Sequence, residues 1–132
     1  MEKNATFQFF SGGRHHFRGF GEWIFSIERN GRLHVEHHVA DQKKHDKFYT
    51  LSPAENDKCW ACIDALKLPS MKGSSRPGVP DEPEYRFLLD DGSCHVEVKI
   101  WANDAQKRPD VKKLVDLIKE IIHRYVKKDV VI

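Results

Sequence analysis

A hairpin in the first third of the chain is the feature that most constrains the fold. Two runs of alternating apolar and polar residues, 22–28 and 32–39, flank the tripeptide Arg29-Asn30-Gly31. A two-residue turn at Asn30-Gly31 would place charged side chains opposite apolar ones, against the period-two pattern of a half-buried sheet. A three-residue loop with Gly31 in the left-handed conformation removes this conflict. The inward-facing pairs that we expect are Ile27 with Leu33, Phe25 with Val35, and Trp23 with His37.

His34, Glu36 and His38 lie on the opposite face of this predicted hairpin. Strand residues two apart point the same way, so the three side chains form one row. Imidazole and carboxylate groups are typical ligands of a divalent metal such as zinc. A straight strand separates His34 from His38 by about 13–14 Å, so a metal site would need ligands from elsewhere. The candidates for these further ligands are His15, His16, His45 and, opposite His38, Glu22.

The same row has a simpler interpretation as the solvated polar face of a sheet. His37 does not belong to the row, because it points to the apolar face beside Trp23. We expect His37 to be a hydrogen-bonded histidine of the core or its rim. For His34, Glu36 and His38, both the metal site and the solvated face remain open on the sequence alone.

Further strands are predicted at 6–10 and 47–51, and a second hairpin at 84–101. With a two-residue turn at Asp91-Gly92, one face of this second hairpin carries apolar pairs and the other carries charged pairs. Its predicted inward pairs are Leu89 with Cys94, Phe87 with Val96, and Tyr85 with Val98. On the outer face, Arg86 would lie opposite Glu97 and Glu84 opposite Lys99, as favourable charge pairs.

Two helices complete the pattern. Ser52 as N-cap, Pro53 at the first helical position and Glu55 three residues after the cap predict a helix start. Apolar residues at helical spacing between 111 and 125 predict a second helix. We therefore expect a single α+β domain over 1–132, with an antiparallel sheet of about five strands and two helices packed on one face.

The Cys59-x-x-Cys62 pair falls inside the first predicted helix. Cys59 is seven residues beyond the N-cap, where the helix dipole no longer lowers the pKa of a thiol. A four-thiolate zinc site would need a second pair, and Cys94 stands alone. We interpret Cys59 and Cys62 as core residues, on one helical face with Ile63 and Leu66.

Two loops are candidates for a binding surface, because loops carry function more often than cores. The loop 11–21 interleaves Arg14, Phe17, Arg18 and Phe20 with glycines, a combination that can grip single-stranded nucleic acid. The loop 69–83 is long for a compact domain and rich in Pro, Gly and Ser. The candidate residues near the end of the sheet beside these loops are Trp101, Asn103 and Asp104.

Composition excludes several classes of protein. The formal net charge is only +2, which does not favour nucleic acid as the main partner. The longest apolar runs are far shorter than the roughly 20 residues that span a bilayer, so we expect no membrane insertion. The N-terminal residues lack a signal-peptide pattern and the cysteine count is odd, which predicts a cytoplasmic protein with reduced thiols. No phosphate loop, nucleophile elbow or other convincing catalytic motif is present in the sequence.

The segment from Pro80 to about Ile122 resembles small bacterial proteins that have no assigned function. The shared pattern is a Pro-Asp-Glu-Pro-x-Tyr entry, a hairpin, a Trp-x-Asn-Asp exit and a Leu/Ile-rich final helix. This resemblance implies a prokaryotic origin and an α+β fold, and it brings no activity and no site residues. The histidines at 34–38 lie outside it.

These observations favour a non-catalytic cytoplasmic domain that binds a protein or a small-molecule ligand without a cofactor. One alternative is a divalent-metal protein or metal-dependent hydrolase that uses His34, Glu36 and His38, with zinc or a similar cation. A second alternative is a weak single-stranded nucleic-acid binder that uses residues 13–21.

Overall fold

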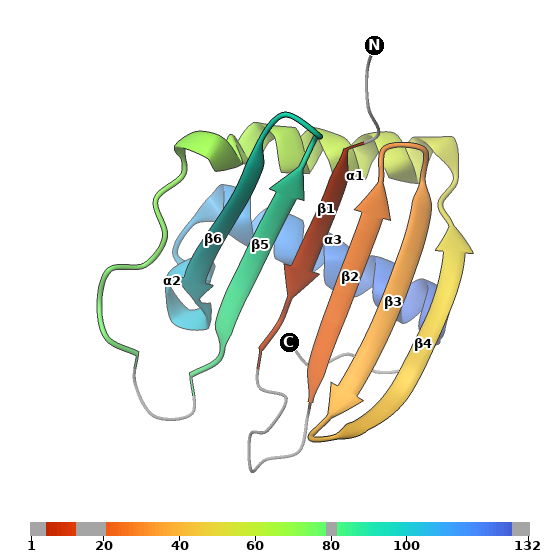
Figure 1. Cartoon of the computed structure of the whole chain (residues 1–132), viewed down its shortest axis with the longest axis horizontal. Helices are drawn as coiled ribbons and strands as arrows, with labels where there is room; N and C mark the ends of the chain where they lie inside the picture. The colour runs from red at the N-terminus through yellow and green to blue at the C-terminus, as the bar shows by residue number, and fades with distance from the viewer. Residues whose placement is uncertain (1–4, 13–20, 79–81, 128–132) are drawn as a thin grey trace.

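The structure is a computed structural model that describes residues 5–12, 21–78 and 82–127. Six strands form one antiparallel sheet in the order β4-β3-β2-β1-β5-β6 (Figure 1). In chain order, the strands are β1 (Thr6–Phe10), β2 (Glu22–Glu28), β3 (Arg32–Val39), β4 (Gln42–Thr50), β5 (Glu84–Asp90) and β6 (His95–Trp101). The central strand β1 explains the alternating sequence of 6–10, because Phe7 and Phe9 are fully buried between β2 and β5.

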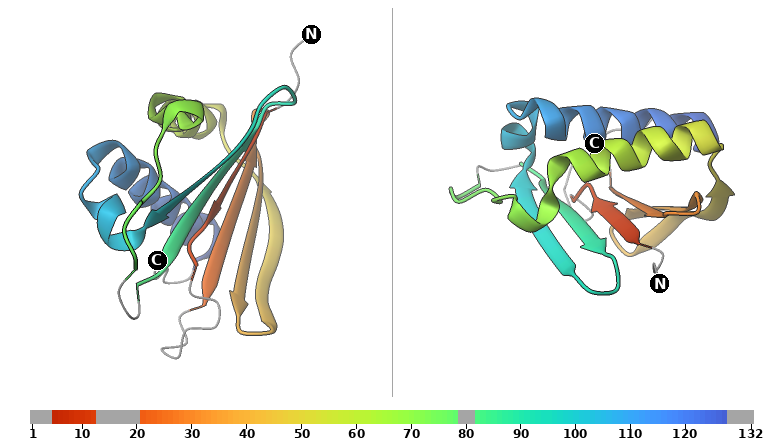
Figure 2. Two further views of the ribbon diagram at one scale, coloured as in Figure 1. Left: turned by 60° about the vertical axis from the view of Figure 1, so that its left-hand side comes forward. Right: turned by 90° about the horizontal axis from the view of Figure 1, so that it is seen from above.

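Helices cover one face of the sheet, and α1 and α3 lie side by side across it (Figures 1 and 2). The helices are α1 (Pro53–Leu66), the 3₁₀ helix η1 (Leu68–Ser70), α2 (Ala102–Gln106) and α3 (Pro109–Val126). The apolar stripe of α3 packs into the core through seven buried residues: Val111, Leu114, Val115, Leu117, Ile118, Ile121 and Ile122. The other face of the sheet carries no helix of the described chain, so its polar side chains meet solvent (Figure 2).

The α+β class is confirmed, with six strands and three α-helices instead of about five strands and two helices. One difference is α2, a short helix of five residues before α3. The six strands all fall on segments predicted as strands, although β4 begins at Gln42 rather than at Lys47. The residues 42–46 are all polar, so they show no apolar alternation and gave no strand signal.

The predicted register of the β2–β3 hairpin is confirmed. Ile27 pairs with Leu33, and the pairing continues in the predicted register to Trp23 opposite His37. Gly31 has a φ of 93°, the left-handed conformation that the three-residue loop requires. The loop tip also docks on the following segment, because the Leu51 N–H donates to the Gly31 carbonyl at 2.9 Å.

The predicted register of the β5–β6 hairpin is wrong by two residues. Leu89 pairs with Val96 rather than Cys94, and Phe87 pairs with Val98. The connection is four residues long, because the Asp91 carboxylate accepts hydrogen bonds from the backbone N–H groups of Ser93 and Cys94. The remaining pairs also differ from the prediction: Tyr85 lies opposite Ile100, Arg86 opposite Lys99, and Glu84 opposite Trp101.

The start of α1 follows the predicted capping pattern. The Ser52 hydroxyl accepts a hydrogen bond from the Glu55 backbone N–H at 3.2 Å, and Pro53 is the first helical residue. Cys59 and Cys62 are both buried, as expected for core residues. Burial raises the pKa of the Cys59 thiol to about 12, so this thiol is far from a reactive thiolate at neutral pH. No described helix has the length and apolar character needed to cross a membrane.

Candidate functional site

The predicted row of polar side chains on the open face of the sheet gains a member from β4. In the β3–β4 register, Glu36 lies opposite Asp46. His34, Glu36 and Asp46 each present one potential metal ligand atom, and these three atoms lie within 4.8 Å of one another. His38 joins them through a hydrogen bond between its Nε2 and Glu36 Oε1 at 3.1 Å. We call His34, Glu36, His38 and Asp46 the β3–β4 cluster.

Asp46 was missed by the sequence analysis, because the connection between β3 and β4 does not look like a hairpin turn. The turn residues are Ala40 and Asp41, and Ala40 adopts a φ of 52° that Gly or Asn would adopt at lower cost. Counted from a turn at 40–41 without a bulge, β4 would place His45 opposite Glu36 and Asp46 opposite Val35. A bulge between His37 and His38 shifts the register by one residue, so that Asp46 rather than His45 lies opposite Glu36.

His34 lies between the two carboxylates of the cluster. Its Nε2 is 2.5 Å from Asp46 Oδ1, and its Nδ1 is 3.8 Å from Glu36 Oε2. The hydrogen bond to His34 is the main reason why the pKa of Asp46 is lowered, and a second hydrogen bond from Lys43 adds to it. The Lys43 pKa is raised by the same contact with Asp46. The carboxylate of Asp46 is therefore ionised and hydrogen-bonded at neutral pH.

The other predicted ligands do not enter this cluster. Glu22 lies opposite His38, as expected, and its carboxylate accepts a hydrogen bond from the Gly12 N–H at 3.2 Å. His45 Nε2 is 2.8 Å from the hydroxyl of Tyr49. His37 stacks on the indole of Trp23, with a centroid separation of 4.0 Å and an interplanar angle of 1°, which agrees with the predicted position at the core.

His15 and His16 lie outside the described residues. So do Arg14, Phe17, Arg18 and Phe20, the basic and aromatic candidates of the first loop. The hypothesis that this loop binds single-stranded nucleic acid therefore stays a prediction.

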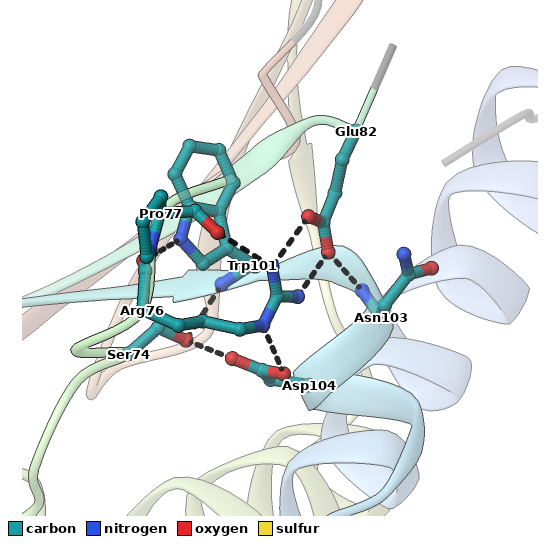
Figure 3. Close-up of polar contacts among 7 residues, drawn as sticks. All are labelled: Ser74, Arg76, Pro77, Glu82, Trp101, Asn103 and Asp104. Carbon is teal, nitrogen blue, oxygen red and sulfur yellow. Dashed lines mark hydrogen bonds and ion pairs between the residues drawn. The ribbon is translucent and has the colours of Figure 1, made fainter. Parts of the chain in front are cut away.

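The candidate residues at the end of β6 contact the chain's own long loop (Figure 3). The Trp101 indole N–H donates to the Arg76 carbonyl at 2.9 Å, and the Asn103 backbone N–H donates to Glu82 Oε2 at 3.0 Å. Asp104 accepts hydrogen bonds from the Ser74 hydroxyl at 2.6 Å and from Arg76 Nε at 3.0 Å. These groups anchor the loop over the end of β6.

This anchored loop also covers the C-terminal end of the outer edge of β6, at Lys99 and Trp101. The Ser74 N–H donates to the Lys99 carbonyl at 2.9 Å, and Gly73 lies so close that a Cβ there would be 2.5 Å from the same carbonyl oxygen. Gly78 packs on the Trp101 ring in a similar way. The C-terminal end of this sheet edge is thus shielded by the chain itself.

The opposite edge, β4, differs from β6. Within the described residues, β4 pairs with β3 alone and stands last in the strand order. Phe48 is 58% exposed on this strand, and the Arg32 guanidinium lies over its ring at 4.6 Å. Lys44 and Lys47 are exposed beside it. We call the outer edge of β4 together with Arg32, Lys44, Lys47 and Phe48 the β4 surface.

The structure thus offers two adjoining candidate sites, the β3–β4 cluster and the β4 surface. They share a boundary, because the His34 ring stacks on Phe48 with a centroid separation of 4.2 Å. No protein-family model matches the chain, and a search of curated proteins finds no match either.

Proposed function

We propose that this chain is a non-catalytic binding domain that docks an extended, acidic protein segment on its β4 surface. The observation that carries the proposal is the contrast between the two edges of the sheet. Among the described residues, β4 pairs on one side only, whereas β6 is shielded by the loop at Ser74. An exposed edge strand can accept a further strand from a partner through main-chain hydrogen bonds.

The side chains of the β4 surface supply anchors for such a partner. Phe48 is a large apolar residue that the fold leaves exposed, and Arg32 lies over its ring. Exposed aromatic residues and arginine are enriched among the residues that dominate binding energies at interfaces. A shallow hollow of about 600 Å³ lies beside them and could hold an apolar side chain of the partner. It is lined by Asn30, Arg32, Phe48, Tyr49 and Thr50.

Charge selects the class of partner. Lys44 and Lys47 make no ion pair with the described residues, so their charges are available to an acidic segment. The same lysines disfavour edge-to-edge pairing of two copies of this chain, because like charges would face each other. The bulge near His38 disturbs the first part of β4, so the regular edge for strand addition is the stretch 45–50. The proposal assigns no reaction, because an open strand edge lacks the enclosed pocket of most catalytic sites.

A displayed library of random nine-residue peptides, selected on the purified domain, tests this proposal. We expect the enriched peptides to be acidic and to carry one large apolar residue. A bound peptide should shift the amide resonances of residues 45–50 more than those of β6. Phe48→Ser should weaken the affinity about tenfold or more, as for a buried interface anchor. Lys47→Glu should weaken the affinity more at low salt than at high salt, because salt screens the ionic attraction that this change removes.

Lys99→Glu is the matched control, because Lys99 is an exposed lysine on the shielded strand β6. Its affinity for the selected peptides should equal that of the wild type. Peptides that bind Phe48→Ser as tightly as the wild type, or that shift β6 amides instead, would contradict the proposal. A selection that enriches no peptide with micromolar affinity would contradict it as well.

A further inference from the structure

We propose that His34, Glu36 and Asp46 form a binding site for a divalent cation of the zinc type. His38 and Lys43 act as positioning residues for the two carboxylates. The site needs no partner protein, so it does not depend on the proposed docking function. Its residues come from β3 and β4, and an ion bound there would cross-link the edge strand to its neighbour.

The distances are close to those of a metal site without any movement of the backbone. One ligand atom from each of His34, Glu36 and Asp46 lies within 4.8 Å of the other two. In a tetrahedral zinc site, bonds of about 2.0–2.1 Å place the ligand atoms about 3.3 Å apart. The His34–Asp46 contact of 2.5 Å is already shorter than this separation. A bound ion therefore requires the His34 and Asp46 ligand atoms to move apart and the Glu36 oxygen to move closer to His34.

Each carboxylate divides its two oxygens between His34 and an outer partner. Asp46 directs Oδ1 to His34 and Oδ2 to the Lys43 ammonium at 3.0 Å. Glu36 directs Oε2 towards His34, at 3.8 Å, and Oε1 to His38 Nε2 at 3.1 Å. Ligands of protein metal sites are oriented in this way by a second layer of hydrogen bonds. Asp46 Oδ1 faces His34 Nε2 and Glu36 Oε2 faces His34 Nδ1, so a shared ion requires side-chain rotation that brings both oxygens to the same ring nitrogen.

The surroundings hold this arrangement in place. The His34 ring stacks on Phe48 at an interplanar angle of 10°, which restricts its rotation. The His34 and Glu36 side chains are only 25% and 22% exposed, so part of the competing hydration is already removed. Both residues stand on a paired strand rather than on a loop, which keeps the ligand positions well defined.

The ligand types indicate which cation is bound. Calcium and magnesium take oxygen ligands almost exclusively, whereas an imidazole with carboxylates suits zinc and related transition metals. Three protein ligands leave a fourth position for water or an external ligand. We therefore expect zinc to bind and calcium and magnesium not to compete with it.

The test is isothermal titration of zinc into protein that was purified without a histidine tag and dialysed against a chelator. We expect one zinc ion per chain and a higher melting temperature with zinc. His34→Gln and Asp46→Asn should abolish this binding, since each removes a ligand while it preserves the side-chain size. His38→Ala should weaken the affinity roughly 10–100-fold, as expected when an outer partner of a ligand is lost.

His95→Ala is the matched control, because His95 Nδ1 lies 3.7 Å from Asp90 in another histidine–carboxylate pair on the surface. It should bind zinc as the wild type does. Melting curves in chelator show that each variant is folded before its titration is interpreted. Absence of stoichiometric zinc in the wild type would overturn the proposal. Unchanged zinc binding in His34→Gln and Asp46→Asn would also overturn it, and would place the ion elsewhere.

Discussion

The guanidinium of Arg76 forms a two-point ion pair with the carboxylate of Glu82, with N–O distances of 3.0 and 2.6 Å. The Glu82 side chain is only 1% exposed, while Arg76 also reaches Asp104 (Figure 3). These contacts raise the pKa of Arg76 further above its ordinary value. Residues on the two arms of a Pro-, Gly- and Ser-rich loop are therefore tied to each other and to α2.

Arg76→Ala is expected to release this loop and to destabilise the protein. The change removes two charge-assisted hydrogen bonds from a buried carboxylate, which lowers the free energy of unfolding more than the loss of an exposed ion pair does. Urea denaturation measures this loss, and amide exchange at 71–78 should become faster. Lys112→Ala is the control, since its ion pair with Asp116 is exposed and contributes less than about 1 kcal/mol. Equal losses in both variants would contradict this role of Arg76.

A contact between α1 and α3 predicts how the protein responds to acid. The Tyr125 hydroxyl donates to Glu55 Oε1 at 2.6 Å, and this hydrogen bond is the main reason why the pKa of Glu55 is lowered. A lowered pKa in the folded state stabilises the fold above the ordinary value of 4.5, and this contribution is lost as the pH falls through the folded-state pKa. Acid should therefore weaken the contact between the two helices.

Tyr125→Phe tests this contact directly. We expect it to lower the free energy of unfolding by about 1 kcal/mol at pH 7, the ordinary contribution of one hydrogen bond. At pH 3 the difference between the variant and the wild type should shrink, because Glu55 is then largely protonated in the unfolded state. Urea denaturation at the two pH values measures both quantities. A difference in the free energy of unfolding that grows at pH 3 would contradict this role of the hydrogen bond between Tyr125 and Glu55.

Tyr85 predicts the behaviour at high pH. Its burial, with a smaller effect of Asp116, raises the pKa of the phenol to about 12. A raised pKa contributes stability that is fully present below the unfolded value of 10 and is lost as the pH rises through about 12. Tyr85→Phe keeps the ring and its edge-on contact with Phe9, and it should shift alkaline unfolding to higher pH. Circular dichroism between pH 9 and 12.5 checks this shift, and an unchanged alkaline midpoint would contradict it.

The cysteines predict a pattern of chemical labelling. Cys59 is fully buried with a pKa near 12, while Cys94 is partly exposed in the β5–β6 connection. A thiol reagent at pH 8 should label Cys94 within minutes and leave Cys59 unmodified until the protein unfolds. Mass spectrometry of digests taken before and after addition of urea locates the labels. Rapid labelling of Cys59 in the native protein would contradict its assignment to the core.

The two hairpins show what an apolar pattern can decide about register. For β2 and β3, the alternative turn differed by one residue, which would have exchanged the two faces of the strand, so the pattern selected the correct loop. For β5 and β6, the alternative differs by two residues, and both registers bury the same face. Only the hydrogen bonds of Asp91 in the folded turn select between them.

For the candidate sites as well, one part could be predicted from the sequence and the other depended on the tertiary structure. Residue periodicity along one strand placed His34, Glu36 and His38 on one face and His37 on the other, because neighbouring side chains of a strand alternate. Asp46 could join them only through the β3–β4 register, which depends on an unusual turn at Ala40 and on a bulge. The exposure of the β4 edge was likewise invisible in the sequence, since strand order arises from pairing between distant segments.

The sequence by itself determined the α+β class, the helix start at Ser52, the register of the first hairpin and the burial of Cys59 and Cys62. Each of these depends on contacts between residues that are close in the chain, or on a periodicity that has one consistent solution. Tertiary structure alone decided that the long loop is tied by Arg76 to Glu82 and Asp104, and that it shields β6 but not β4. Those outcomes depend on which distant segments of the chain contact each other, and local periodicity carries no information about such contacts.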